Sequence, residues 1–321
     1  MRNFVLVCLV VLGSLSVLAF QAATQADKPM ALYPQWAMHV PDKTQPPAAE
    51  ESKEPIHIPG SSKAYTAAEI DDLANPPDWF PNEHGAVPSI IQHAKGGALA
   101  CGACHLMSGH GHPESADLAG LPVEYLVRQM ADFKNEARTD GGRMAEIGKV
   151  ISNEDARQAA EWFASLKPSS WVKVVEKDMV PKSYVATRGR MRLPWVPESM
   201  EPIRSRIIEL PEDPARATSR DPHSGFIAYV PVGSIAKGEA LVKGGSGKTI
   251  ACAICHGDDL KGIGDIPRIA GQHPDYLVRQ LWFFQGKAYS GSSSALMKKV
   301  VEKLYQEDMV AIAAYVASLN P

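Results

Sequence analysis

The sequence predicts an all-α fold in which two tandem helical domains are joined by a long proline-rich, partly β connection. Three observations support this fold class: an internal repeat, helical periodicity within each copy, and seven prolines in the segment between the copies. Two similar copies indicate one type of domain used twice. The prolines disfavour a continuous helix between them, and short runs such as WVKVV and RIIEL favour local strands.

The internal repeat relates two parts of the chain by a constant offset of 151 in residue number over much of its length. Residues 101–105 (CGACH) match residues 252–256 (CAICH), and the pentapeptide YLVRQ occurs at both 125–129 and 276–280. After a short insertion the offset becomes 153, and it then aligns EWFASL with AYVASL near the end of each copy. A tandem duplication explains this agreement better than chance.

Each copy also shows the spacing of amphipathic helices. Apolar residues recur at i, i+4 and i+7 beside the YLVRQ motif, and the last helix of each copy has its own apolar stripe. Ser152, followed by Asp155 three positions later, is typical of a helix start. The stripe residues are Leu126, Met130 and Phe133 in the first copy and Leu277, Leu281 and Phe284 in the second.

The repeat and the composition together divide the chain into five segments. Residues 1–26 form a leader, and residues 27–84 form a proline-rich tether and preamble that includes the apolar-poor stretch PDKTQPPAAEESKEP. The first helical domain spans 85–168, the connection spans 169–225, and the second helical domain spans 226–321. With 45% hydrophobic and 21% charged residues, the chain has enough apolar content for a sizeable core.

The leader resembles a secretory signal peptide. Arg2 precedes an uncharged apolar run at 4–20, and the small-residue stretch QAATQA follows it. The length of this run is at the lower limit for a membrane span, so an uncleaved N-terminal anchor remains the alternative. We therefore expect a periplasmic protein that is soluble after cleavage or anchored by its N-terminus. Cys8 lies inside the apolar run and receives no role.

Four cysteines remain after cleavage, and all of them belong to C-x-x-C-H motifs, which predict covalent attachment of haem c. The two thiols can add to the vinyl groups of one porphyrin, and the adjacent histidine can then bind the iron. A zinc ribbon would place the two pairs about 15 to 20 residues apart, and a thioredoxin-like pair would need a βαβ unit. The predicted attachment residues are Cys101, Cys104, Cys252 and Cys255, and the histidine ligands are His105 and His256.

With these motifs, the two copies resemble class I cytochrome c domains, and their tandem arrangement resembles the dihaem cytochrome c4-like family. The resemblance covers about 97–168 and 234–321. It implies two haems per chain and a methionine as the second axial ligand of each iron, downstream of the motif and before the final helix. The positions that match are Met144 and Met297, which align at the offset of 153.

Other residues compete for the role of second axial ligand. Met130 and Met309 lie on apolar helix stripes and are expected in the core, and Met107 follows the first motif too closely to reach the opposite side of a haem. His110 and His112 are competent ligands, and they remain the alternatives in the first copy.

The resemblance also implies a proline carbonyl that orients each iron-binding histidine. Pro267 fits this role in the second copy, whereas Ala116 occupies the equivalent position in the first, with Pro113 three positions earlier. Haem contacts and ordinary helix packing are both open for the aromatic and basic residues of the YLVRQ motifs, which are Tyr125, Arg128, Tyr276 and Arg279.

Histidine and methionine ligation would fill both axial positions, which favours electron transfer over catalysis. We therefore expect a non-enzymatic, one-electron carrier between a donor dehydrogenase or quinol-oxidising complex and an acceptor oxidase or cytochrome. The alternatives are a cytochrome subunit of a larger oxidoreductase and, less favoured, a peroxidase-like dihaem enzyme. A net charge of −3 without a basic cluster argues against nucleic-acid binding.

Overall fold

The computed structural model describes residues 34–46, 53–140, 142–286, 288–291 and 293–321. The predicted leader, including Cys8, lies outside these residues. The described residues belong to one compact unit. Among them, no helix is both long enough and apolar enough to cross a membrane.

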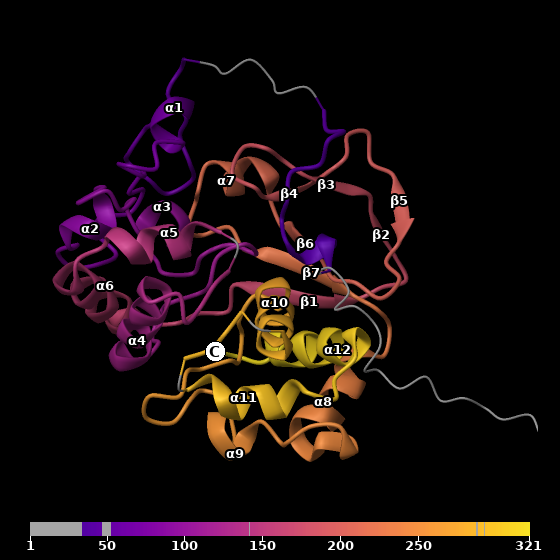
Figure 1. Ribbon diagram of the computed structural model, residues 1–321. Coiled ribbons are helices and arrows are strands. Elements are labelled where there is room, and N and C mark those ends of the chain that lie inside the picture. Colours follow the sequence, from indigo (N-terminus) through magenta and orange to yellow (C-terminus); the bar gives the residue numbers. More distant parts are fainter. Residues whose placement is uncertain (1–33, 47–52, 141, 287, 292) are drawn as a thin grey trace, which may run out of the picture. The chain divides into compact units, whose positions relative to one another are not determined.

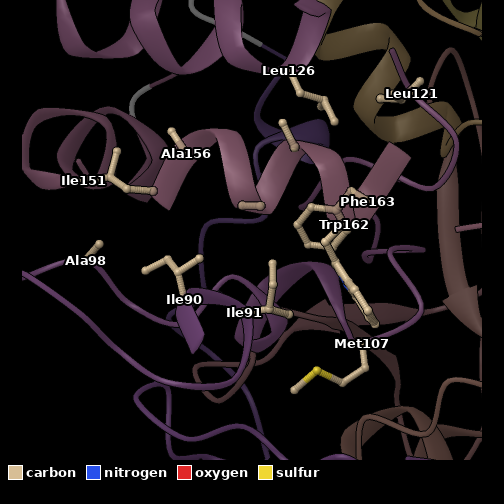
Figure 2. Packing of buried hydrophobic residues seen from close by; sticks show 12 residues of the cluster. Ile90, Ile91, Ala98, Met107, Leu121, Leu126, Ile151, Ala156, Trp162 and Phe163 are labelled. Carbon is tan, nitrogen blue, oxygen red and sulfur yellow. The ribbon is translucent and has the colours of Figure 1, made fainter. Parts of the chain in front are cut away.

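The first copy of the repeat contains five helices, drawn in purple and magenta in Figure 1. Its final helix begins as predicted, because the Ser152 side chain accepts a hydrogen bond of 3.0 Å from the backbone N–H of Asp155. The core of this copy packs α6 against both α2 and α4, with Ile91 on α2, Phe163 on α6 and Leu126 on α4 (Figure 2). The helices are α2 (Ser89–Gln92), α3 (Gly102–His105), α4 (Val123–Lys134), α5 (Arg143–Val150) and α6 (Asn153–Ser165).

The second copy repeats this arrangement, but the helix before its motif is longer, with 11 residues in α8 against four in α2. Helix α8 lies against α12 at Gly238, where a Cβ atom would overlap the carbonyl oxygen of Ala311. Met309 is fully buried in this core, so its predicted structural role is confirmed. The helices are α8 (Ser234–Gly244), α9 (Ala253–His256), α10 (Pro274–Gln285), α11 (Ser294–Val301) and α12 (Gln306–Ala317).

The prediction of an all-α fold is wrong. Strands β1, β7 and β6 form one sheet, in which β7 pairs in parallel with β1 and antiparallel with β6, and β2–β5 and β3–β4 form two antiparallel ribbons. One strand, β7, even lies within the range assigned to the second helical domain. The strands are β1 (Val172–Glu176), β2 (Met179–Pro181), β3 (Ser183–Val185), β4 (Arg192–Pro194), β5 (Met200–Pro202), β6 (Ile208–Pro211) and β7 (Phe226–Val230).

The sheet exists because its strands bury alternate side chains against helices. In β7, Phe226, Ala228 and Val230 are buried and their neighbours are only partly so. Ala228 and Val230 share a core cluster with Val278 of α10 and Val310 of α12. The connection therefore supplies a structural layer against the second copy. Four short helices complete the fold of the described residues: η2 (Gln35–Ala37), α1 (Ala67–Ile70), α7 (Pro214–Thr218) and η3 (Gly245–Gly247).

The two copies meet at equivalent positions of the repeat. Arg138 forms an isolated antiparallel bridge with Tyr289, which is its counterpart at the offset of the repeat. On either side of this bridge, the N–H of Thr139 donates to the carbonyl of Ala288 at 2.8 Å, and the N–H of Ser290 donates to the carbonyl of Ala137 at 2.6 Å. Contacts between equivalent residues are the mark of an isologous interface, so the copies are related by an internal two-fold axis.

A buried ion pair lies at a second equivalent position. Arg268 Nη2 is 2.9 Å from Asp117 Oδ2, the two residues are again counterparts in the repeat, and both side chains are almost fully buried. The same guanidinium donates to the carbonyls of Ala119 and Ala270, which are themselves equivalent. Both terminal nitrogens of the guanidinium are thus hydrogen-bonded, Nη1 within its own copy and Nη2 to the first copy across the interface.

We predict that Asp117→Asn lowers the free energy of unfolding by about 3 kcal/mol, because Arg268 would stay buried without a carboxylate. Chemical denaturation of the purified protein measures this change. The control is Glu239→Gln, which breaks the exposed pair between Lys243 and Glu239 and should leave stability unchanged. Equal effects of the two substitutions would show that the ion pair is not important for stability.

Candidate haem sites

One cavity of about 970 Å³ reaches both C-x-x-C-H motifs. This volume lies at the upper end of the range usual for ligand pockets. The cavity brings together every residue that the sequence predicted as a haem attachment or axial position. These residues are Cys101, Cys104, His105 and Met144 from the first copy and Cys252, Cys255, His256 and Met297 from the second.

A single helical turn arranges each motif. Helices α3 and α9 begin directly after the first cysteine, and the N–H of His105 donates to the carbonyl of Cys101 at 3.0 Å. The N–H of His256 bonds in the same way to Cys252 at 2.9 Å. Residues three and four positions apart share one face of a helix. Both cysteines and the histidine of each motif therefore face the cavity together, and all four cysteines are free of disulfide bonds.

Each motif histidine is oriented by a backbone carbonyl. The Nδ1 of His105 lies 2.9 Å from the carbonyl oxygen of Ala116, and the Nδ1 of His256 lies 2.9 Å from that of Pro267. A carbonyl can only accept, so Nδ1 carries the proton and Nε2 is left to bind a metal. Position 116 holds an alanine where the second copy has a proline. This difference does not alter the contact, because the contact uses the backbone carbonyl.

The protonation states of the motif residues also suit a covalently bound haem. Burial lowers the pKa of both His105 and His256, which keeps them as the neutral imidazoles that bind metals. Burial raises the pKa of Cys101 to about 12 and that of Cys252 to about 11. These sites thus stabilise uncharged sulfur, which is the state of sulfur in a thioether.

The two candidate methionines occupy matching places, although not the loop that the resemblance implied. Met144 lies in α5 and Met297 in α11, the short helices that precede the final helix of each copy. Both side chains are half-buried and line the cavity.

The competing histidines lie beside His105. The loop that carries them turns back on the motif, because the N–H of Gly111 donates to the carbonyl of His105. His110 does not line the shared cavity: its Nε2 is 2.7 Å from Ser169 Oγ and its ring packs against Trp171. His112 does line the cavity, with its Nδ1 3.3 Å from Glu114 Oε1. Met144 and His112 therefore both line the cavity, whereas His110 does not.

The aromatic and basic residues of the YLVRQ motifs line the cavity as well. Both arginines have protein partners there. Arg128 lies 3.8 Å from the Asp265 carboxylate, and buried Arg279 donates to the carbonyls of Ala37 and Pro113. These residues therefore both pack against other parts of the protein and line the cavity.

The sequence analysis missed Arg138, which lines the cavity on the internal two-fold axis. Its guanidinium is buried and donates to Gln129 Oε1 at 2.6 Å and Gln280 Oε1 at 3.0 Å. It forms no ion pair with a carboxylate within the described ranges. A buried cation needs an anion nearby, and the propionates of a haem carry that charge. The residues present therefore fit haem. The sequence did contain a signal for Arg138, because the repeat aligns this arginine with Tyr289, a residue of a different type.

The chain is similar in sequence to several known proteins. No family model matches the chain. The chain is 26% identical to a cytochrome c4 of Pseudomonas aeruginosa over 74% of its own length and 91% of that protein. It is 35% identical over 75 residues to cytochrome c-554(548) of Halomonas halodenitrificans, of which it covers 90%. The chain belongs to the cytochrome c family. The predicted resemblance of this cytochrome to the cytochrome c4 group is confirmed.

One further known protein and one solved structure are similar to this cytochrome. It is 26% identical to a thiosulfate dehydrogenase electron acceptor of Thiomonas intermedia, over 73% of the chain and 84% of that protein. Among solved structures, reduced recombinant cytochrome c4 from Pseudomonas stutzeri is 22% identical, with a TM-score of 0.46 over 68% of this chain and 93% of that one.

We predict that Met144→Ala and Met297→Ala each lower the reduction potential of one haem and let cyanide or carbon monoxide bind quickly, because a weak axial thioether donor is lost. Absorption spectroscopy, including the near-infrared methionine band, and redox titration measure these effects. Met309→Leu, in the core, is the control and should change neither.

The same experiment tests the alternative ligand. If Met144→Ala leaves the first haem six-coordinate with an unchanged potential, while His112→Gln changes it, the assignment of Met144 is wrong. His110→Gln then distinguishes the two histidines.

Proposed function

We propose that this chain is an exported dihaem c-type cytochrome that transfers single electrons between redox partner proteins. The observation that carries the proposal is the one cavity lined by both motifs and both methionines. Bound haem would supply an iron that cycles between the ferric and ferrous states. Electron transfer is the activity that its relatives named cytochrome c4 share with the proposal.

The chain's own residues would divide the work of holding the two haems. Cys101 and Cys104 would attach the first, with His105 and Met144 as axial ligands. Cys252, Cys255, His256 and Met297 would do the same for the second. Two protein ligands on each iron leave no open position for a substrate, which supports a carrier rather than an enzyme.

A shared cavity also supports electron exchange within the chain. Its wall contains residues of both copies, including the equivalent tyrosines Tyr125 and Tyr276 and the arginine between them, Arg138. The two sites therefore face a common space instead of being separated by a hydrophobic core. A carrier with two such sites can accept two electrons in successive steps.

A second candidate function is a dedicated cytochrome subunit of a larger oxidoreductase. One relative is named as the electron acceptor of thiosulfate dehydrogenase, which supports this assignment. The connection and the preamble also extend beyond what a small shuttle needs. Purification of the native protein under mild conditions separates the two: a stable complex with a catalytic subunit supports the subunit role.

We predict two covalent haems per chain. Intact-protein mass spectrometry, on protein made in cells with haem-attachment machinery, should show two haem additions. The double substitution Cys101→Ala with Cys104→Ala should remove one addition and retain the other. One haem or none in the unaltered protein would disprove the dihaem proposal.

We also predict that the mature protein is periplasmic and begins near residue 20 to 27, because a leader of this composition is cleaved during export. N-terminal sequencing of periplasmic and membrane fractions tests this. Met1 retained on membrane-bound protein would instead identify the leader as an anchor.

A further inference from the structure

Four titratable side chains are buried together where the N-terminal segment meets β6 and the start of α10. We call His39, Glu209, His273 and Asp275 the junction cluster; none of them is more than 1% exposed. Electron transfer as proposed above gives them no role. Buried charges are costly unless they are paired, so a cluster of this kind calls for an explanation.

The cluster consists of two imidazole–carboxyl pairs. His39 Nε2 lies 3.2 Å from Asp275 Oδ2, and His273 Nδ1 lies 2.5 Å from Glu209 Oε1. The backbone N–H of Asp275 also donates to Glu209 Oε2 at 3.4 Å, which links the pairs. The three parts of the chain that supply them are far apart in the sequence.

The hydrogen-bond partners of each pair leave a place for one proton between its members. The other nitrogen of His39, Nδ1, faces the carbonyl of Arg190 at 3.3 Å, and the other nitrogen of His273, Nε2, faces the carbonyl of His110 at 3.2 Å. Carbonyls only accept, so these outer nitrogens carry protons. The contact with each carboxyl is then a hydrogen bond only when a further proton is bound, on the imidazole or on the carboxyl group.

The cluster has room to change its proton content. Asp275 Oδ1 is buried with no hydrogen-bond partner in the part of the chain that the structure describes. The pair of Glu209 and His273, in contrast, binds its proton firmly. Burial raises the pKa of Glu209, and the neighbouring Glu209 raises the pKa of His273 despite the opposing effect of burial.

Other charged groups face the cluster from each neighbouring element. Arg192 of β4 and Arg279 of α10 face Asp275. Glu114 faces His39, and Asp117 faces His273, both from the loop after the first motif, which also carries His110. Asp117 is paired with Arg268 and Glu114 with His112. The two arginines thus oppose the negative charge of Asp275.

One member of the cluster reaches the haem cavity. His39 lines it together with Met38 and Arg279. An electron added in that cavity is a negative charge in a space whose wall includes the His39 imidazole, and buried charges are weakly screened. The reduced state therefore favours the protonated imidazole. No bond other than that of the transferred proton changes.

We propose that the junction cluster, through the His39–Asp275 pair, binds one proton more in the reduced protein than in the oxidised protein, so that electron transfer is coupled to proton uptake. The electron comes from the donor protein and the proton from solvent. This inference rests on the proposed function, because it requires a haem in the cavity. The two C-x-x-C-H motifs imply electron transfer, and the junction cluster would couple that transfer to proton uptake.

The experiment is a redox titration of the holoprotein at a series of pH values from about 5 to 9, which includes the range where histidine ordinarily changes charge. The midpoint potential of one haem should fall as pH rises. Full coupling of one proton to one electron corresponds to about 59 mV per pH unit. A pH-indicator dye in unbuffered solution should report proton uptake directly when the wild-type protein is reduced.

The key variant is His39→Gln, which keeps a polar amide near Asp275 but cannot titrate in this range. It should flatten the pH dependence and abolish the dye signal. His93→Gln is the matched control, because His93 is an exposed histidine outside the cavity wall, and it should behave as wild type. Asp275→Asn is a second variant and should also reduce the slope, because the imidazolium loses its carboxylate.

A pH-independent wild-type protein, or a slope that survives in both His39→Gln and Asp275→Asn, would overturn the proposal. A surviving slope would belong to another group, such as a haem propionate. If His39→Gln does not fold, Asp275→Asn alone gives the answer. Absence of haem in the wild-type mass spectrum is a different result, because it contradicts the proposed function itself.

Discussion

The contact between equivalent residues of the two copies is the constraint on which the rest of the structure depends. Arg138 meets Tyr289 and Asp117 meets Arg268, and in each case the partner is the counterpart in the other copy. An isologous contact fixes both the angle and the distance between the copies, because each residue on one side has its counterpart on the other. The shared cavity follows from this, since the interface turns the open face of each motif toward the other.

The sheet stabilises the second copy at a different surface. The inner side of β7 packs on α10 and α12, and Glu209 of β6 reaches the start of α10. The connection also touches the first site, where Arg220 donates to the carbonyl of Ala103, inside the motif. A segment rich in proline thus connects the two haem sites physically as well as in sequence.

Much of the site could be predicted from the sequence because its geometry is local. A C-x-x-C-H motif needs one helical turn, and the turn forms at both places. The family resemblance implied a methionine in each copy, and the repeat offset then selected Met144 and Met297, which both line the cavity. Their place on short helices was missed, because helices as short as α5 and α11 carry too weak a periodic pattern.

Other features depend on contacts between distant segments, and the sequence could not predict them. The strands of the connection are short, and some of their pairing partners lie far along the chain, as Phe226 does from Val172. Local propensity does not determine such pairings. The junction cluster joins His39 to Asp275 across 236 residues. The departure at Ala116 looked important in the sequence, but only its backbone is used.

The Asp117–Arg268 pair affects which halves of the chain can associate. Two identical half-length subunits meeting in this way would place aspartate against aspartate, or arginine against arginine, at this position, and buried like charges repel. Opposite charges at this position require two halves that differ in sequence. Neither half could self-associate through this surface without burying a repulsive pair. The ion pair therefore favours contact between the two different halves of the chain over contact between two copies of the same half.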